Sequence, residues 1–386
     1  MAIIEPIGGH GGMNYYDFGL CAGLAQAGIA ATLYTCDETE VAHELPFAVK
    51  PYFHGIYGKK PRWVRATYYL LGLIGSLLEA RLLGSEIIHF HFFHSTFLEY
   101  VTVKLARLLG LKIVITAHDV ESFVHNTRHG IAKKIYSAST IVIAHNQMIR
   151  KELRERLHVH ESKIRVIPHG NYIDFIPKNI TQRQARKWLG LEGKGPVILF
   201  WGQIKAVKGL DLLLDALPHV VKRFPSLRLI IAGRVWKDHY SVYNALINEK
   251  GMTDHVVSHI QYIPDACVGY YFHATDLVVL PYRRIYQSGV LLMAMSYGSP
   301  VLVSDLEGMT EIIQDNKNGF VFRSNDSDHL KQRLDEILSD PQKMEEVALA
   351  GYDTVVTQHD WATIGRQTAD VYRALDRPLK YKNNVC

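Results

Sequence analysis

Short apolar runs alternate along the chain with longer segments in which apolar residues recur at helical spacing. The runs are apolar on both faces, as in the buried strands of a parallel sheet, and we expect helices between them. Nine runs are expected to be strands: residues 2–7, 29–35, 86–93, 112–119, 140–146, 196–202, 227–233, 276–282 and 299–305. Strands that alternate with helices predict an α/β fold.

The strand-like runs form two series. Residues 165–182 separate them with prolines, a glycine and asparagines, a composition typical of a linker. The sequence therefore predicts two tandem Rossmann-like, doubly wound domains, residues 1–170 and residues 171–360, with a cleft between them. We expect residues 361–386 to form a C-terminal helix that crosses back to the first domain.

Composition narrows the classes of function. The 386 residues are 48% hydrophobic and 21% charged, enough apolar side chains for two cores. A net charge of +5 is compatible with anionic ligands or an anionic membrane surface, but it is too small to indicate nucleic-acid binding. The four cysteines form no CxxC pair, which disfavours a zinc site and fits a reducing cytoplasm. No cleavable signal is visible, and no apolar run reaches the ~18 residues that a spanning helix needs.

Ligands of open α/β sheets bind beyond the carboxyl ends of the strands, so the loops there are the first candidates. The first expected strand runs into GGHGGMN, which contains Gly11 and Gly12 and precedes a helix. Glycines let the backbone approach a ligand closely, and a helix N-terminus offers free N–H groups to an anion. The spacing is not GxGxxG, which disfavours a dinucleotide site, and a tight turn without a ligand is the alternative.

Histidines stand at two of the expected strands. His118 follows the run KIVIT, where an imidazole can hydrogen-bond a substrate hydroxyl; an ordinary loop histidine is the alternative. In HFHFFH, His89 and His91 share one strand face, and His91 or His94 is expected to line the cleft. We expect no metal site there, because no carboxylate or cysteine is seen to complete the set.

The second domain offers two loops for an anion. Lys208 stands at a strand-to-helix junction, where a lysine beside open N–H groups can bind a phosphate; a solvated surface lysine is the alternative. Arg234 follows the next strand and is a weaker candidate of the same kind.

The segment RRIYQSGV starts like a ligand loop and continues into a helix. Ser288 is expected to cap that helix, so that the N–H groups of Gly289 and Val290 point at an anion; a simple helix start is the alternative. The basic and polar side chains beside the cap are Arg283, Arg284 and Gln287.

Taken in order, these loops resemble the pattern of a retaining glycosyltransferase of family 4, with the GT-B fold. The match runs over nearly the whole chain. The residues that carry the resemblance are the pair Gly11 and Gly12, the cleft histidine His118, the G-R-x-x-x-x-K-G segment at Gly202, Lys208 and Gly209, the G-x-P-V segment at Gly298, Pro300 and Val301, and the G-x-x-E segment at Gly308 and Glu311.

The chain departs from the family pattern at three positions. Gln203 stands where the family has an arginine, and Ile285 and Met293 stand where it has the two glutamates of E-x7-E. The loop instead resembles a variant branch with a Q-S-G-V sequence. The resemblance then implies that diphosphate binding uses Lys208 and backbone N–H groups, and that ribose recognition comes from elsewhere, for which we name Glu307 or Glu311.

The implied activity is that of a hexosyltransferase. It would move a sugar from a UDP- or GDP-linked donor to a hydroxyl of a saccharide or lipid-linked acceptor, with retention and without a metal or cofactor. His118 would position the donor sugar, Lys208 would stabilise the leaving diphosphate, and closure about residues 168–180 would exclude water.

A basic segment bears on the location of the protein in the cell. Lys59, Lys60, Arg62 and Trp63 precede a leucine-rich helical stretch, a combination that can lie in an anionic membrane interface. We expect a cytoplasmic protein that is peripheral on the inner face of the membrane and binds no nucleic acid. An ordinary helix packed on the sheet is the alternative.

Other functions on the same fold stay open. A non-catalytic sugar-nucleotide-binding protein is favoured by the missing glutamates and disfavoured by His118 and Lys208. A sugar-nucleotide epimerase or hydrolase needs an acid–base pair that the sequence does not reveal. A dehydrogenase is the weakest alternative, because the glycine spacing is wrong.

Overall fold

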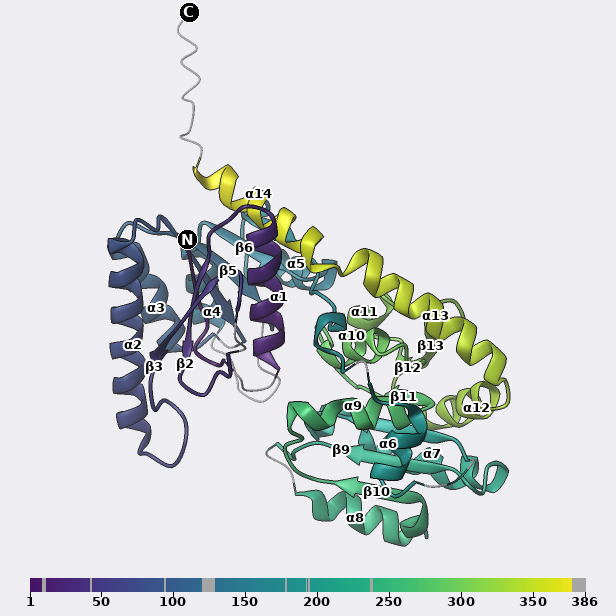
Figure 1. Cartoon of the computed structure of the whole chain (residues 1–386). Helices are drawn as coiled ribbons and strands as arrows, with labels where there is room; N and C mark the ends of the chain where they lie inside the picture. Colours follow the sequence, from purple (N-terminus) through teal and green to yellow (C-terminus); the bar gives the residue numbers. More distant parts are fainter. Residues whose placement is uncertain are drawn as a thin grey trace, which may run out of the picture. The chain divides into compact units, whose positions relative to one another are not determined.

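The computed structural model places two compact units, and each holds one sheet (Figure 1). The first unit is Met1–Gly170 with His359–Cys386, and the second is Asn171–Gln358. The structure describes residues 1–8, 12–41, 44–93, 95–119, 129–177, 179–191, 193, 195–236 and 239–376, without the side chain of residue 129.

The first unit contains a parallel sheet of seven strands in the order β3-β2-β1-β4-β5-β6-β7. The strands are β1 (Ala2–Ile4), β2 (Thr32–Cys36), β3 (Ala48–Phe53), β4 (Ile87–Phe92), β5 (Lys112–Ala117), β6 (Ile141–Ala144) and β7 (Ile164–Val166). The helices before the linker are α1 (Met13–Gln26), α2 (Arg62–Leu82), α3 (Phe97–Leu108), α4 (His129–Ala138) and α5 (Gln147–Glu155). The strand order reverses between β1 and β4, which is where ligands bind in doubly wound folds.

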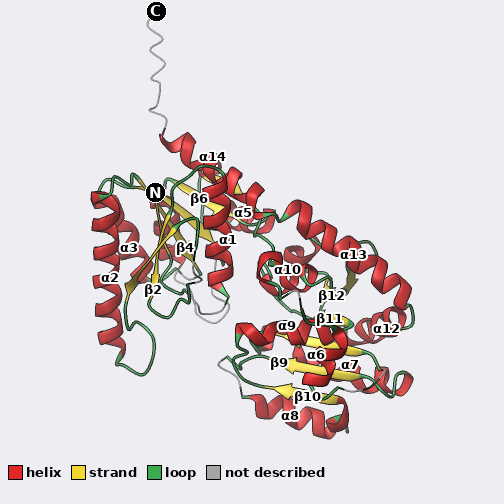
Figure 2. Ribbon diagram, viewed as in Figure 1, coloured by secondary structure: helices red, strands yellow, loops and turns green. Residues whose placement is uncertain are grey.

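The second unit repeats this plan with six strands in the order β10-β9-β8-β11-β12-β13, all parallel (Figure 2). The strands are β8 (Val197–Trp201), β9 (Arg228–Ala232), β10 (Val256–His259), β11 (Leu277–Leu280), β12 (Val301–Ser304) and β13 (Phe320–Phe322). The helices are α6 (Gln182–Trp188), α7 (Leu210–Arg223), α8 (Tyr240–Glu249), α9 (Asp265–Ala274), α10 (Gly289–Ser296), α11 (Glu307–Thr310), α12 (Ser327–Leu338) and α13 (Pro341–Gln358). Its order reverses between β8 and β11.

Each of the nine expected strands is confirmed, and the α/β architecture with two parallel sheets is confirmed with them. Four strands were not predicted, namely β3, β7, β10 and β13. They lie at or next to the edges of the sheets, where one side of the strand stays accessible and the sequence need not be apolar. β7 begins just before the segment expected to be a linker.

The C-terminal helix α14 (Trp361–Asp376) packs against α1 within the first unit, as the neighbouring yellow and purple helices of Figure 1 show. The two backbones touch, because a Cβ atom on Gly365 would lie 2.1 Å from the carbonyl carbon of Gly23. Gly19 and Gly170 make room for Trp361, since a Cβ on either would lie 2.1–2.2 Å from its indole. The return to the first unit starts at His359 rather than at residue 361, and residues 377–386 lie outside the described part.

Candidate functional site

The switch point of the second unit is built on close backbone contacts. Gly202, directly after β8, has φ 101°, and Gly233, directly after β9, has φ 144°. A Cβ on Gly233 would lie 1.9 Å from the carbonyl oxygen of Gly202. Only glycine fits both conditions, so the two loops are held against each other at the carboxyl edge of the sheet.

Lys208 ends a short 3-10 helix (Ala206–Lys208) that lies against the end of β11. Gly209 follows with φ 67°, and a Cβ there would lie 1.9 Å from the carbonyl oxygen of Pro281. The Lys208 Nζ is 3.5 Å from the ring centroid of Tyr282, which is fully buried. This cation–π contact orients the ammonium group at the switch point.

Ser288 caps α10 as expected, because its hydroxyl accepts the N–H of Leu291 at 3.2 Å. The first turn of α10 contains no acidic side chain, so no carboxylate of that turn competes for its N–H groups. A Cβ on Gly289 would lie 2.7 Å from the Tyr172 hydroxyl, and one on Gly202 would lie 3.4 Å from a methyl of Val290. The structure thus brings the predicted residues Gly202, Lys208, Ser288, Gly289 and Val290 to one place.

The sequence placed Arg283 beside the predicted anion site, but in the structure other groups of the same unit engage its guanidinium. Its guanidinium donates two hydrogen bonds to Asp211, at 2.7 and 2.6 Å, and further ones to the Ala206 carbonyl and to Asn325. The Asp211 carboxylate raises the pKa of Arg283. Arg283 therefore ties the end of β11 to α7 and to the loop that carries Lys208.

The other predicted residues of this unit lie around the same edge. Gln203, Arg234 and Arg284 are exposed, and Gln287 is half-buried. Glu307 and Glu311 are exposed on and just after α11, whose Gly308 packs against the loop before α10: a Cβ there would lie 2.4 Å from the Tyr286 carbonyl oxygen. Ile285 and Met293 are both half-buried.

In the first unit, four histidines form a row at the carboxyl edge of the sheet. His91 is in β4, His118 and His145 directly follow β5 and β6, and His169 lies beyond β7. Adjacent strands of a sheet are ~4.8 Å apart, and this spacing sets the distance between the rings. The ring centroids are 5.5 Å apart between His91 and His118, 4.9 Å between His118 and His145, and 5.5 Å between His145 and His169.

Tyr16 of α1 lies at the centre of this row. Its ring contacts all four imidazoles edge-on, at centroid distances of 4.8–5.4 Å, and contacts Trp361 at 5.3 Å. Sequence reasoning named His118 and, with His94 as the alternative, His91, but it missed His145 and His169, although His145 directly follows an apolar strand just as His118 does.

His118 is buried, stacks on Phe93 at 4.3 Å and directly follows β5, as expected. Burial lowers its pKa well below the ordinary histidine range, so the imidazole stays neutral at pH 7. Its Nε2 atom and that of His145 have no hydrogen-bond partner within the described part of the chain. An unpaired buried polar atom costs about 1–3 kcal/mol, so a hydroxylated ligand that pairs with these nitrogens is favoured.

A buried carboxyl pair at the switch point of this unit was also missed. Glu5 directly follows β1, and Asp17 is in the second turn of α1. The Asp17 Oδ1 lies 3.0 Å from the Nδ1 of His91, and burial raises the pKa of both carboxyl groups. The expectation that no carboxylate stands beside the HFHFFH histidines is therefore wrong, although no group of three His, Cys, Asp or Glu in the described residues is arranged to hold a metal ion.

Gly12 is the N-cap of α1, with φ 82°, and as a glycine it makes no side-chain cap hydrogen bond. Gly11 and His94 lie outside the described residues.

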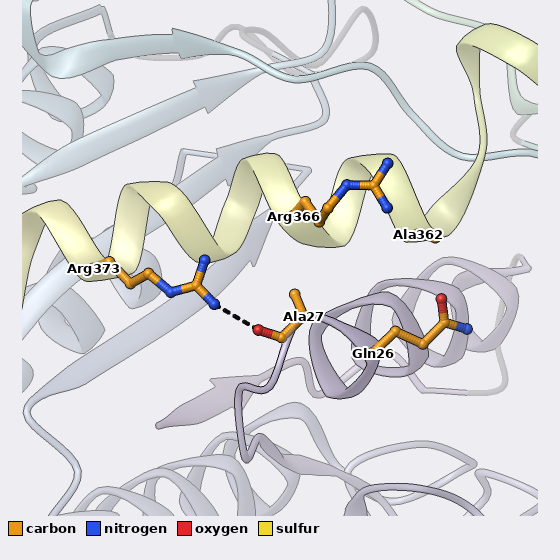
Figure 3. Close-up of a pocket in the computed structure, with 5 residues that line it drawn as sticks. All are labelled: Gln26, Ala27, Ala362, Arg366 and Arg373. Atoms are coloured by element: carbon orange, nitrogen blue, oxygen red, sulfur yellow. Dashed lines mark hydrogen bonds between the residues drawn. The ribbon is translucent and has the colours of Figure 1, made fainter.

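A separate pocket of about 200 Å³ lies between the C-terminal part of α1 and α14 (Figure 3). Its walls are Gln26, Ala27, Ala362, Arg366 and Arg373. Figure 3 shows Arg373 reaching the end of α1, where it donates a hydrogen bond to the Ala27 carbonyl at 2.6 Å. Because α1 runs away from the carboxyl edge of the sheet, this pocket contains none of the predicted site residues.

Comparison with known proteins identifies the family of both units. Residues 181–354 match the family model of the glycosyl transferases group 1, and residues 10–174 match that of glycosyltransferase family 4. The chain therefore belongs to the family 4, group 1 glycosyltransferases and has the GT-B fold. It is a hexosyl-transferring enzyme of the kind that uses nucleotide sugars.

Relatives cover almost the whole chain. A D-inositol 3-phosphate glycosyltransferase of Nocardiopsis dassonvillei is 23% identical over 98% of this chain and 93% of its own length. Sucrose-phosphate synthase of Thermosynechococcus elongatus has a TM-score of 0.79 at 20% identity, over 97% of this chain and 98% of that one. HepE of Anabaena, solved in complex with UDP-glucose, has a TM-score of 0.74 at 19% identity, over 97% and 99%. At these identities the structural likenesses show the fold.

Proposed function

We propose that the protein transfers a hexosyl group, with retention, from a UDP- or GDP-linked sugar to a hydroxyl of a saccharide or lipid-linked acceptor. The observation that carries the proposal is the arrangement at the switch point of the second unit, where Lys208 and the N-terminus of α10 stand together. The UDP-glucose complex of the structural relative HepE supports a nucleotide-sugar donor.

The diphosphate is assigned to Lys208 and to the backbone N–H groups of Gly289 and Val290 at the start of α10. Negative charge grows on the leaving diphosphate as the glycosidic bond breaks, and fixed donors stabilise that charge without reorganising. We propose that these groups take this role without a metal ion.

Ribose binding is assigned to Glu307 or Glu311, because apolar side chains occupy both positions of the family glutamates. The support is that α11 packs directly against the loop containing Ile285 and Tyr286. A carboxylate from α11 can accept hydrogen bonds from ribose hydroxyls, which neither Ile285 nor Met293 can do.

His118 is assigned to the donor sugar, as the family resemblance implies. A neutral imidazole whose Nε2 has no partner among the described residues can donate to or accept from a sugar hydroxyl, and its stacking on Phe93 fixes the ring. His145 offers a second such nitrogen on the next strand.

The buried carboxyl pair does not favour a hydrolase. Glycoside hydrolases hold two carboxyl groups about 5–9.5 Å apart, on either side of the scissile bond. Glu5 and Asp17 are at most 1% exposed, so a sugar cannot reach them.

The test is nucleotide release. Purified protein is incubated with each common sugar nucleotide, with and without a bacterial lipid extract, and free UDP, GDP or TDP is measured. Release that requires one donor and the extract establishes the transferase and a lipid acceptor. If the protein binds a sugar nucleotide but releases no nucleotide with any donor and acceptor, it is a non-catalytic sugar-nucleotide-binding protein. Release without an acceptor would indicate hydrolysis.

The membrane proposal rests on α2. This helix buries one face, with Leu73 and Leu77, against the rest of its unit, as the alternative from sequence expected. Its opposite face is apolar and exposed, with Trp63 at 74%, Leu71 at 61% and Leu82 at 86%. Ile74 and Leu78 continue the same stripe at helical spacing, and Lys59, Lys60 and Arg62 are exposed at its start. Among the described helices, none is long and apolar enough to cross a membrane.

We predict that Trp63→Ser with Leu71→Ser lowers binding to vesicles of phosphatidylglycerol and phosphatidylcholine at least about tenfold. Each large apolar side chain buried in the interface contributes about 1.5 kcal/mol or more. Flotation of the protein with the vesicles measures the effect. Leu349→Ser, an exposed leucine of α13, is the matched control and should bind like the wild type. If the double variant floats with the vesicles as well as the control does, α2 is not the surface that binds the membrane.

A further inference from the structure

We propose that Arg283 is a positioning residue for Lys208, because it ties the turn Ala206–Lys208 to the end of β11 and so fixes where the ammonium group lies. The inference rests on the proposed function, in which Lys208 stabilises the leaving diphosphate. Its structural half, the dependence of the turn on Arg283, can be tested without any activity.

The turn Ala206–Lys208 is held only weakly by its own backbone. It is a 3-10 helix of three residues, in which the Lys208 N–H donates to the Lys205 carbonyl at 2.8 Å and the Gly209 N–H donates to the Ala206 carbonyl at 3.1 Å. Short 3-10 turns have poorer hydrogen-bond geometry than α-helices. Contacts from other elements are therefore needed to fix the position of Lys208.

Arg283, shortly after β11, supplies such contacts. Its backbone N–H donates to the Val207 carbonyl at 2.8 Å, and its guanidinium Nη1 donates to the Ala206 carbonyl at 3.0 Å. One residue thus holds two successive carbonyls of the turn. The ring of its neighbour Tyr282 contacts the Lys208 ammonium at 3.5 Å, and this cation–π contact forms only while the turn stays in place.

The guanidinium of Arg283 is itself fixed by two further elements. Its Nη1 and Nη2 donate to the two carboxylate oxygens of Asp211, in the first turn of α7, at 2.7 and 2.6 Å. Its Nε donates to the Asn325 Oδ1, in the loop between β13 and α12, at 3.0 Å. A bidentate pair with a carboxylate holds the planar guanidinium in one orientation. The Ala206 carbonyl is thus bonded to a group that has little freedom to move.

The same contacts disfavour a direct role of Arg283 on the diphosphate. Each guanidinium nitrogen already donates to a protein group, and the Asp211 carboxylate would repel an anion that approached. The side chains of Arg283 and Asp211 are 30% and 44% exposed, and a partly exposed ion pair adds little to stability. Loss of Arg283 should therefore displace the turn without unfolding the second unit.

Arg283→Ala should lower kcat/KM for nucleotide-sugar turnover about tenfold or more, because a catalytic group displaced by about 1 Å can lose this much. Arg186→Ala is the matched control. Arg186 makes the same kinds of bond in the same unit, to Asp276 at 2.6 Å and to the Ala274 carbonyl at 3.0 Å, but just before β11, at the opposite end of that strand. Its loss should leave the wild-type rate nearly unchanged, and an Arg283→Ala variant that loses no more than this control would overturn the proposal.

Two further variants distinguish positioning from a direct contact. Arg283→Ala in the Lys208→Ala background should change kcat/KM by less than about threefold, because a residue that acts only through Lys208 has nothing left to position. Arg283→Lys keeps the charge but loses the planar fork, so it should lose nearly as much as Arg283→Ala. Equal losses in both backgrounds, or recovery of the wild-type rate by lysine, would show that Arg283 acts by its own charge and would refute a positioning role.

Hydrogen exchange of the Lys208 and Gly209 amides gives a readout that needs no activity. Their protection should fall about tenfold or more in Arg283→Ala and in Arg283→Lys, and it should stay at the wild-type level in Arg186→Ala. Circular dichroism checks that each variant is folded. Unchanged protection in Arg283→Ala contradicts the proposal. If the wild type releases no nucleotide from any donor, the proposed function fails, and the exchange experiment alone decides whether Arg283 holds the turn.

Discussion

Alanine in place of Lys208 is expected to lower kcat/KM for nucleotide-sugar turnover by about 100-fold or more. Loss of one preorganised donor to a developing charge costs about 3–4 kcal/mol in known enzymes. Lys208 fits this role because Gly209 fixes its backbone against Pro281 and the ring of Tyr282 holds its ammonium group at 3.5 Å. The measurement is steady-state release of the nucleotide with saturating acceptor.

The matched control for this prediction is Lys205→Ala. Lys205 is in the same loop, but its Nζ lies 5.7 Å from the ring of Trp236, so it should lose at most a few fold. Lys208→Arg should recover part of the activity, since the charge is kept while the compact ammonium is replaced by a planar group. Equal losses for Lys205→Ala and Lys208→Ala would indicate a general effect of surface charge and would refute the assignment.

The buried strands of both units are predictable from the sequence because burial on both faces leaves an unbroken apolar run. β8 and β11 are of this kind, and their residues are almost all buried. β3 is different: it contains Lys50 and Pro51, is partly exposed and lies at the edge of its sheet. Such a segment gives no apolar run to find, and its place is set by pairing with β2.

The site is predictable as far as local rules determine it. Ser288 could be identified as a cap, and His118 and Lys208 as residues at strand ends, because each depends only on its neighbours in sequence. The pairing of Arg283 with Asp211 joins residues 72 positions apart, and that of Asp17 with His91 depends on β4 lying next to β1. The signal for Glu5 and Asp17 in the sequence was a charged residue inside an otherwise apolar segment. Such a signal does not reveal which other residue the charged side chain contacts.

On acidification, the first unit is expected to unfold before the second. Burial lowers the pKa of His91 and His145 to about 4 and that of His169 to about 3, and it lowers those of His89 and His118 well below the usual value. In the second unit, the described histidines with a lowered pKa are His259 and His273, both only partly buried. Unfolding of the first unit in acid therefore takes up more protons than unfolding of the second unit.

The sign and size of this effect follow from linkage. Below the unfolded histidine pKa of about 6.5, each of the five imidazoles takes up a proton only on unfolding, so stability is lost as the pH falls from about 6.5 toward 4. Burial also raises the pKa of the Glu5 and Asp17 carboxyl groups, so protons already bound there in the folded state offset up to two of the five. The remaining three protons correspond to roughly 4 kcal/mol per pH unit, a large part of the stability of a domain.

Urea denaturation at pH 7, 6 and 5, followed by hydrogen exchange in α1 and in α7, measures the two units separately. His145→Asn should flatten the dependence of the first unit by about 1.4 kcal/mol per pH unit. If α7 loses protection before α1, or if the first unit is equally stable at pH 7 and 5, the row of histidines is not the neutral, buried cluster that its packing indicates.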